Sequence, residues 1–294
     1  MNLSLIIPVY NEKDTLPSLF DAIYKTMNAL GQSWEVILVD DGSQDDSLSV
    51  LKEYAQKDSQ HVRVISFRRN FGQTPAIAAG LDYAQGEIII LLDADMQNDP
   101  ADIPMMLAKL DEGYDLVSGW RKSRKDNVFT RNLPSMMANW LISRVTGVHL
   151  HDYGCTLKAY RRDVLEGFRL YGEMHRFIPV FASSVGAKIT EVPVQHYARK
   201  FGKTKYGLER TVKVVLDLFT VKFLVAFASK PIYLFGGTGG LLITLSTMSL
   251  IYLLIRRVFF SISVMGSPLF QVSAMLFILG FQSMLMGLIA ELLV

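Results

Sequence analysis

The stretch EIIILLDADMQND, residues 87–99, has the clearest pattern in the chain. It begins with a continuous apolar run, which is typical of a strand buried on both faces of a sheet. The run ends in Asp93 and Asp95, which repel each other and are costly to desolvate unless a cation joins them. Mg²⁺ or Mn²⁺ accepts carboxylate, water and phosphate oxygens together. The stretch therefore indicates a metal site, although two solvated loop acids would have the same spacing.

Strand and helix patterns alternate around this stretch through about the first 120 residues. Such alternation predicts an α/β fold with a mainly parallel, Rossmann-like sheet and helices on both faces. The predicted strands are residues 3–9, 35–40, 62–67, 87–93 and 115–118, and the predicted helices are 15–30, 47–56, 74–84 and 102–112.

Polar clusters follow three of these strands, at residues 8–12, 40–43 and 93–97. In open parallel sheets, ligands bind beyond the carboxyl ends of the strands, so the three clusters are expected to share one site. The sequence contains neither a glycine-rich dinucleotide fingerprint after the first strand nor a Walker-type phosphate loop. Dinucleotide-dependent and P-loop enzymes are therefore excluded.

The overall composition narrows the class of protein. Half of the 294 residues are hydrophobic and 20% are charged, which excludes a disordered chain and is too apolar for an ordinary soluble enzyme. A net charge of +2 gives no argument for nucleic acid as a partner. The single cysteine, Cys155, excludes an internal disulfide framework, and the five histidines have no zinc spacing.

Two apolar stretches, residues 232–255 and 269–294, lie near the end of the chain. Each has roughly the 20 residues that a helix needs to cross a bilayer, although two helices of a large soluble core are the alternative. Basic residues dominate 199–230, and residues 1–9 do not resemble a signal peptide. We therefore expect an integral protein of the inner (plasma) membrane with its catalytic domain in the cytoplasm. Gly236 and Gly240 have the spacing of closely packed membrane helices, and they, with Gly280 and Gly287, are expected to pack helix on helix within or between subunits.

The segment between the two parts has apolar residues at three- and four-residue intervals. It is expected to form an amphipathic helix on the membrane surface, or a helix packed on the catalytic domain. The predicted organisation is a catalytic domain at 1–206, a juxtamembrane amphipathic helix at 207–230 and a transmembrane helical hairpin at 231–294.

Taken together, the motifs resemble the inverting glycosyltransferases of family 2, which have the GT-A fold. More narrowly, they resemble the polyprenyl-phosphate glycosyltransferases, namely the dolichyl-phosphate mannose synthases and the bacterial bactoprenol glucosyltransferases. The likeness extends over essentially the whole chain. The motifs that carry it are PVYNE (8–12), DDGSQD (40–45), RNFG (69–72), DADMQ (93–97), GWR (119–121), DYGC (152–155) and RKFGKTKYG (199–207).

This resemblance implies a pocket for a nucleotide sugar. Asp40 would contact the base and Asp41 the ribose, while Asp93 and Asp95 would hold Mg²⁺ or Mn²⁺ and the diphosphate, with Asp95 as the more direct ligand. For Asp41, capping of the helix after Ser43 is an equal alternative. The full predicted nucleotide-sugar set is Pro8, Tyr10, Glu12, Asp40, Asp41, Asp93, Asp95 and Gln97.

The acceptor side requires cations, because a lipid phosphate must be held beside a diphosphate that repels it. Guanidinium groups grip phosphate oxygens well. A solvated or lipid-headgroup role is an equal alternative for any one of the candidates. The candidates are Arg121, Arg131, Arg199, Lys203 and Lys205.

Asp152, Asp95 and Arg121 form the predicted catalytic set. In the family, an aspartate at the position of Asp152 is often assigned as the catalytic base. A phosphate monoester, however, is already mostly dianionic at neutral pH, so little proton abstraction is needed. We therefore interpret Asp152 as a positioning group or an acceptor for a sugar hydroxyl, with the role of base as the lesser option.

The predicted activity is transfer of a hexose, first glucose from UDP-glucose, onto undecaprenyl or another polyprenyl phosphate. A mannose synthase that uses GDP-mannose is one alternative. A processive polysaccharide synthase is another, but the chain lacks the QxxRW motif and the additional spans of that class. A non-catalytic membrane scaffold is the third. The lipid bilayer and further copies of the chain, in a homo-oligomer, are the other expected partners.

Overall fold

The computed structural model describes residues 2–122, 133–167, 170–197, 209–227, 230–261 and 263–293. The chain divides into two compact units, Met1–Lys222 and Phe223–Val294. The predicted boundary between residues 206 and 207 lies outside the described ranges, so the division into three parts remains a prediction.

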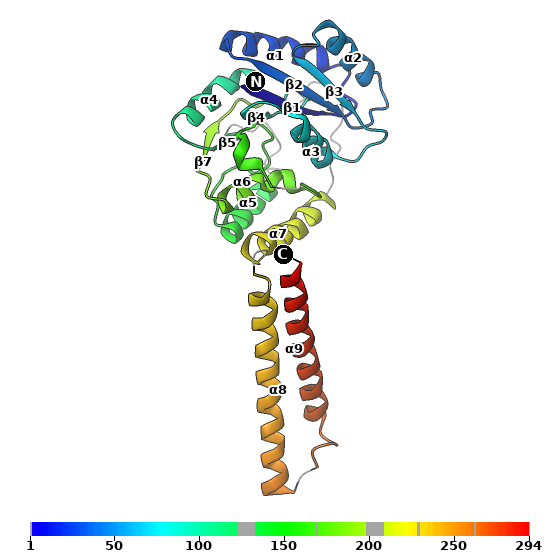
Figure 1. The fold of residues 1–294 in the computed structure, drawn as a ribbon, viewed down its shortest axis with the longest axis vertical. Helices are drawn as coiled ribbons and strands as arrows, with labels where there is room; N and C mark the ends of the chain where they lie inside the picture. The colour runs from blue at the N-terminus through cyan, green and yellow to red at the C-terminus, as the bar shows by residue number, and fades with distance from the viewer. Residues whose placement is uncertain are drawn as a thin grey trace. The chain divides into compact units, whose positions relative to one another are not determined.

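A seven-stranded mixed sheet forms the centre of the first unit, in the order β3-β2-β1-β4-β6-β5-β7 (Figure 1). β6 pairs antiparallel with β4 and β5, and the other neighbouring strands pair parallel. The expected mainly parallel sheet is thus confirmed, while β6 and β7 were not predicted. The strands are β1 (Leu3–Val9), β2 (Trp34–Asp40), β3 (Val62–Ser66), β4 (Ile88–Leu91), β5 (Leu116–Trp120), β6 (Lys158–Arg161) and β7 (Ile189–Pro193).

Helices cover both faces of this sheet (Figure 1). α1 to α4 lie where the sequence predicted helices, and α7 lies within the segment expected to be amphipathic. In α7, Leu218 and Val221 are buried while Leu216 and Phe219 are exposed, so the helix has both a packed and an open apolar face. The helices are α1 (Leu16–Leu30), α2 (Ser47–Lys57), α3 (Gln73–Tyr83), α4 (Ile103–Asp111), α5 (Leu133–Thr146), α6 (Ile178–Ser184) and α7 (Glu209–Phe227).

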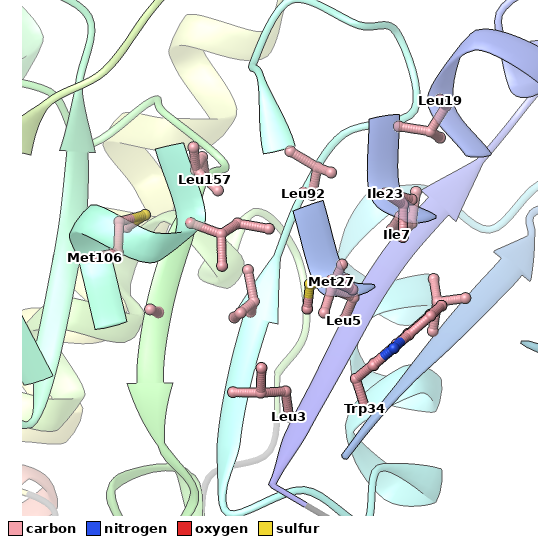
Figure 2. Close-up of a cluster of buried hydrophobic side chains, with 14 of the residues drawn as sticks. Leu3, Leu5, Ile7, Leu19, Ile23, Met27, Trp34, Leu92, Met106 and Leu157 are labelled. Atoms are coloured by element: carbon pink, nitrogen blue, oxygen red, sulfur yellow. The ribbon is translucent and has the colours of Figure 1, made fainter. Parts of the chain in front are cut away.

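The central strands are buried on both faces and therefore separate two apolar cores. In β1, Leu5 and Ile7 belong to one core and Ile6 to the other, because successive side chains of a strand point to opposite faces. Figure 2 shows the first core, to which Ile23 of α1 and Ile7 of β1 both belong. Truncation of a leucine buried here, such as Leu5, to alanine is expected to cost about 2–5 kcal/mol.

The reversed direction of β6 determines which residues share the functional edge of the sheet. β1, β2, β4 and β5 all end at one edge, because they run parallel to one another. β6 runs the opposite way, so residues 152–157, which lead into it, lie at that same edge. Two segments distant in sequence, the end of β5 and the turn before β6, thereby become neighbours.

The second unit contains α8 (Ile232–Phe260) and α9 (Pro268–Leu292), which are both long and apolar enough to cross a membrane. Only 17% of the most apolar window of each helix is buried, unlike a core helix of a soluble protein. Gly239 and Gly280 form the close contact between them, since a Cβ on Gly239 would lie 2.6 Å from the Gly280 carbonyl oxygen. The expected helix packing at Gly280 and Gly287 is confirmed, because a Cβ at either position would meet atoms of α8 within 3 Å. Within the described chain the Cβ positions of Gly236 and Gly240 lie more than 4 Å from α9, so a contact of these two glycines between subunits stays a prediction.

Candidate functional site

The predicted site residues within the described ranges come together along the edge where β1, β2, β4 and β5 end. Pro8, Tyr10 and Glu12 lie at and after the end of β1, and Asp40 and Asp41 lie at the end of β2. The segment that follows β4 carries Gln97 and the two aspartates Asp93 and Asp95, called the acid pair below. Arg121 directly follows β5. Asp152 reaches the same edge through the turn before β6. The remaining predicted acceptor residues, Arg131, Arg199, Lys203 and Lys205, lie outside the described residues.

The loops after β1 and β2 are joined by hydrogen bonds. The backbone N–H of Asn11 donates to Ser43 Oγ at 3.0 Å, and the N–H of Gln44 donates to Asn11 Oδ1 at 2.7 Å. The N–H of Glu12 donates to Ser47 Oγ at 2.9 Å. Asn11 has a φ of +53°, a conformation that asparagine tolerates better than most residues. The two loops that are predicted to line the nucleotide pocket are thus held together by hydrogen bonds.

Asp41 holds a third loop to this edge. Its carboxylate accepts the backbone N–H groups of Phe71 and Gly72 at 2.7 and 2.9 Å. Burial raises the pKa of Asp41, and these two hydrogen bonds act against that rise. The alternative role as cap of the helix after Ser43 is wrong, because Asp45 accepts the N–H of Ser47 at the start of α2. Gly72, which directly precedes α3 as its N-cap, has a φ of +99°, a conformation that favours glycine.

In the acid pair at the end of β4, burial and mutual repulsion both disfavour the ionised form of Asp93. Asp93 Oδ1 accepts a hydrogen bond from Gln73 Nε2 at 2.7 Å, and Asp95 Oδ1 accepts the N–H of Gln97 at 3.1 Å. Burial, followed by the charge of Asp95, raises the pKa of Asp93 to about 6, although Arg121 and Lys158 act in the opposite direction. An added cation would relieve this repulsion.

The carboxylate oxygens at the end of β4 are suitable ligands for a hard divalent cation. Within the described ranges, no group of three or more His, Cys, Asp or Glu side chains forms a complete metal site. Two protein carboxylates are nevertheless enough for Mg²⁺ or Mn²⁺ when substrate phosphates and water provide the other ligands. The chemistry of Asp93 and Asp95 is therefore consistent with a metal that binds together with its substrate.

Arg121 and Asp152 form a two-point ion pair. Arg121 Nε and Nη2 donate to Asp152 Oδ2 and Oδ1 at 2.7 and 3.0 Å, and the Gly154 N–H also donates to Oδ1 at 3.1 Å. The Asp152 side chain is 2% exposed and that of Arg121 is 18% exposed. Burial alone would lower the pKa of Arg121, but the hydrogen bond and charge of Asp152 raise it. Arg121 is therefore a fixed cation at the edge of the sheet.

Two further cations in this region were not recognised in the sequence. Lys158 is buried at the start of β6, where Nζ donates to the carbonyl oxygens of Tyr153, at 3.3 Å, and of Cys155. Burial lowers the pKa of Lys158. Arg176 lies in the short 3₁₀ helix η4 (Met174–Phe177) and approaches Gly154. Neither residue belongs to a motif, and Lys158 lies in a strand that the sequence did not predict.

Gln97 contacts the segment that follows β7. Its Nε2 donates to the carbonyl oxygen of Tyr197 at 3.4 Å, and the Tyr197 N–H donates to the Gln97 carbonyl oxygen at 2.9 Å. An isolated β-bridge between Asn98 and His196 extends this contact. Residues 195–197 are thereby held next to the tip of β4.

Comparison with known proteins assigns the chain to a family. Residues 4–168 match the family described as Glycosyl transferase family 2. The dodecaprenyl-phosphate galacturonate synthase of Rhizobium johnstonii is 41% identical over 294 residues, covering 99% of this chain and 87% of that protein. The undecaprenyl-phosphate 4-deoxy-4-formamido-L-arabinose transferase of Klebsiella pneumoniae is 39% identical over 290 residues, covering 98% and 87%.

Solved structures show the same fold at lower sequence identity. Glucosyl-3-phosphoglycerate synthase from Mycobacterium tuberculosis in complex with UDP matches with a TM-score of 0.59 at 19% identity, covering 76% of this chain and 79% of that chain. A complex of that enzyme with Mn²⁺, UDP and phosphoglyceric acid matches with a TM-score of 0.58 at 20% identity, covering 76% and 78%. The predicted GT-A-like fold is thus confirmed.

The chain belongs to glycosyl transferase family 2. Within that family, it belongs to the polyprenyl-phosphate glycosyltransferases, as the sequence motifs predicted.

Proposed function

We propose that this protein transfers a sugar from a nucleotide sugar onto the phosphate of a polyprenyl phosphate at a membrane surface. One observation carries the proposal: the acid pair Asp93–Asp95 and the fixed cation Arg121 lie at the same edge of the sheet. Such an edge suits two anionic substrates, one neutralised through a metal and the other by a guanidinium group. The names of the relatives at 41% and 39% identity support polyprenyl phosphate as the acceptor.

The proposed reaction is a single in-line displacement. The bond between the anomeric carbon and the diphosphate oxygen breaks, and a bond from an acceptor phosphate oxygen to that carbon forms. The nucleoside diphosphate leaves with the bonding electrons, and the sugar inverts its configuration. No proton has to be removed, because a phosphate monoester is already mostly ionised at neutral pH.

Asp93 and Asp95 would hold Mg²⁺ or Mn²⁺, whose chemistry here would be to neutralise the charge of the leaving diphosphate. The nucleoside would be bound by the two hydrogen-bonded loops, which carry Tyr10, Glu12, Asp40 and Asp41. Loops that are already held in place lose little conformational entropy when a ligand binds, which favours tight and oriented binding.

Asp152 acts in this proposal as the residue that orients Arg121. Both of its oxygens already accept hydrogen bonds from the guanidinium, and it is almost completely buried. A carboxylate neutralised in this way is a weak proton acceptor and would repel the nucleophile less than a free one. The ion pair therefore supports the positioning role over the role of base.

The proposal also includes the identity of the sugar donor. UDP-glucose remains the donor predicted from the sequence, whereas the relatives are named for galacturonate and for 4-deoxy-4-formamido-L-arabinose. GDP-mannose is the alternative donor. α8 and α9, by length and composition, would anchor the enzyme so that its site meets the lipid phosphate. A cytoplasmic catalytic domain and a homo-oligomer remain predictions.

The test is transfer measured with the full chain in detergent or vesicles. A panel of UDP-glucose, UDP-galacturonate, the UDP form of the formamido-arabinose and GDP-mannose is offered with a short-chain polyprenyl phosphate, with and without Mg²⁺ or Mn²⁺. We expect metal-dependent formation of a polyprenyl-phosphate sugar from one donor. Release of a long polysaccharide would favour a processive synthase, and absence of transfer from every donor would favour a scaffold.

A further inference from the structure

Around Gly154, the described structure brings together two arginine side chains, of which only Arg121 belongs to the predicted site. A Cβ placed on Gly154 would lie 3.2 Å from Arg121 Nη2, 3.5 Å from Asp152 Oδ1 and 3.9 Å from Arg176 Nη1. Two guanidinium groups therefore approach the same Cβ position. The charges of both also contribute to lowering the pKa of Lys158, which places a third cation in the same electrostatic cluster.

Arg176 has its own acidic partner within this arrangement. Its Nε lies 3.5 Å from Glu173 Oε2, and its side chain is 24% exposed. The separation is longer than that between Arg121 Nε and Asp152 Oδ2, at 2.7 Å. A guanidinium group has five N–H donors, so Arg176 can contact Glu173 and a phosphate oxygen at the same time.

The segment that carries Arg176 is held by two contacts just before that residue. The backbone N–H of Glu173 donates to Asp217 Oδ2 of α7 at 2.8 Å. The His175 ring is within hydrogen-bond distance of Thr74, at 2.6 Å, in the first turn of α3. The neighbouring residue in α3, Gln73, holds Asp93. The position of Arg176 is therefore tied to α7 and to α3, whose Gln73 contacts Asp93.

We propose that Arg176 is a phosphate-binding residue of the site, oriented by Glu173 and, through the backbone of Glu173, by Asp217. Its ligand is a substrate phosphate oxygen, which comes either from the acceptor monophosphate or from the donor diphosphate. This proposal rests on the proposed function for its choice of substrates. Arg121 and Arg176 together would hold phosphate oxygens from two directions, which orients the group as well as neutralising it.

The experiment compares the affinities of the full-length protein for farnesyl phosphate and for UDP with Mn²⁺, without turnover, by titration calorimetry. Arg176→Gln is expected to weaken binding of one of the two by about tenfold or more, since it removes a charged hydrogen bond. Weaker binding of farnesyl phosphate identifies the acceptor as the source, and weaker binding of UDP identifies the donor. Arg176→Lys, which keeps the charge, is expected to recover part of the loss.

Glu173→Gln and Asp217→Asn provide variants that leave Arg176 intact. Each is expected to weaken binding of the same ligand by about two- to fivefold, because the guanidinium becomes less well oriented. Arg162→Gln is the matched control: Arg162 is exposed in the turn after β6, beyond the opposite end of that strand. It is expected to leave both affinities unchanged.

The proposal is overturned if Arg176→Gln binds both ligands within twofold of the unmodified protein. It is also overturned if Arg176→Lys and Arg176→Gln lose the same affinity together with the same drop in thermal unfolding temperature, which would indicate a structural role. Because these are binding measurements, they are independent of the donor panel. A protein that fails to transfer any sugar contradicts the proposed function, whereas unaltered affinities contradict the role of Arg176.

Discussion

The tip of β4 and the turn that enters β6 both carry buried or half-buried carboxylates at one edge of the sheet, but their surroundings differ. Asp152 forms a two-point ion pair with Arg121. Asp93 lies beside a second acid, and burial with that neighbour raises its pKa to about 6. A carboxylate with a fixed guanidinium is already neutralised, whereas one crowded by another acid gains from an added cation. The comparison indicates that Asp152 serves to orient Arg121, whereas Asp93 and Asp95 are prepared to bind an added cation.

The largest effect on the transfer rate is expected from a substitution in the acid pair after β4. Asp95→Asn removes one of the two carboxylates that would hold the metal, so transfer should fall by roughly a hundred- to a thousandfold. Initial rates measured across a Mn²⁺ titration check this. Asp21→Asn, on the exposed face of α1, is the control and should leave the rate unchanged. A rate for Asp95→Asn equal to that of the control would count against a metal at this tip.

Breaking the ion pair in the turn should affect stability as well as transfer. Asp152→Asn leaves the largely buried Arg121 without its partner, which is expected to cost about 3–5 kcal/mol of unfolding free energy. Denaturant unfolding of the protein in detergent measures this. The double variant with Arg121→Gln should lose less than the sum of the two single variants. If Asp152→Asn abolished transfer at unchanged stability, Asp152 would be a base and not a positioning residue.

The two carboxylates should also respond differently to pH. In the proposed function the metal would bind ionised Asp93, and the raised pKa of Asp93 means that a proton would compete with the metal below about pH 6. The apparent Mn²⁺ affinity should therefore be independent of this group above pH 6 and fall by about tenfold per unit well below it. Calorimetry between about pH 5 and pH 7 measures the slope. Asp93→Asn should flatten it; an unchanged slope in that variant would assign the titration to another group.

The smallest effect is expected at Asp41, a third buried carboxylate held by backbone N–H groups. Asp41→Asn keeps one acceptor oxygen and turns the other into a donor that faces the N–H of Phe71 or Gly72. A loss of about 1–2 kcal/mol is expected, because one buried hydrogen bond is lost without unpairing a cation. The same unfolding experiment tests it. A loss larger than that of Asp152→Asn would reverse the proposed order of the three carboxylates.

Much of the α/β half of the fold could be predicted from local sequence pattern. β4 is a continuous apolar run that ends in two acids, and the first four helices have the spacing of one buried face, so each element follows from neighbouring residues. β6, in contrast, is the four-residue strand KAYR, which carries two charged side chains and has no strand pattern. It forms because β4 and β5 offer pairing partners on both sides.

Part of the site could likewise be predicted from local sequence pattern, and part could not. The acid pair and the loops after β1 and β2 lie at strand ends, where ligand-binding residues are expected. Arg176 could not be predicted, because its approach to Gly154 depends on contacts with α3 and α7 that are distant in sequence. The contact of α8 with α9 likewise forms at Gly239 and Gly280, and Gly239 was not singled out in the sequence, because spacing along one helix does not determine which face meets its partner.

The sequence by itself determined the strand-end acids, the family and the two long apolar helices, because each depends on the order of nearby residues. The tertiary structure decided that Arg121 would meet Asp152, 31 positions further along the chain, and that Arg176 would join them. The physical reason is the reversed direction of β6, which brings the turn before it to the edge where the parallel strands end. Charges that attract one another at that edge are separated in sequence by whole elements, so only the packing of the sheet could select them.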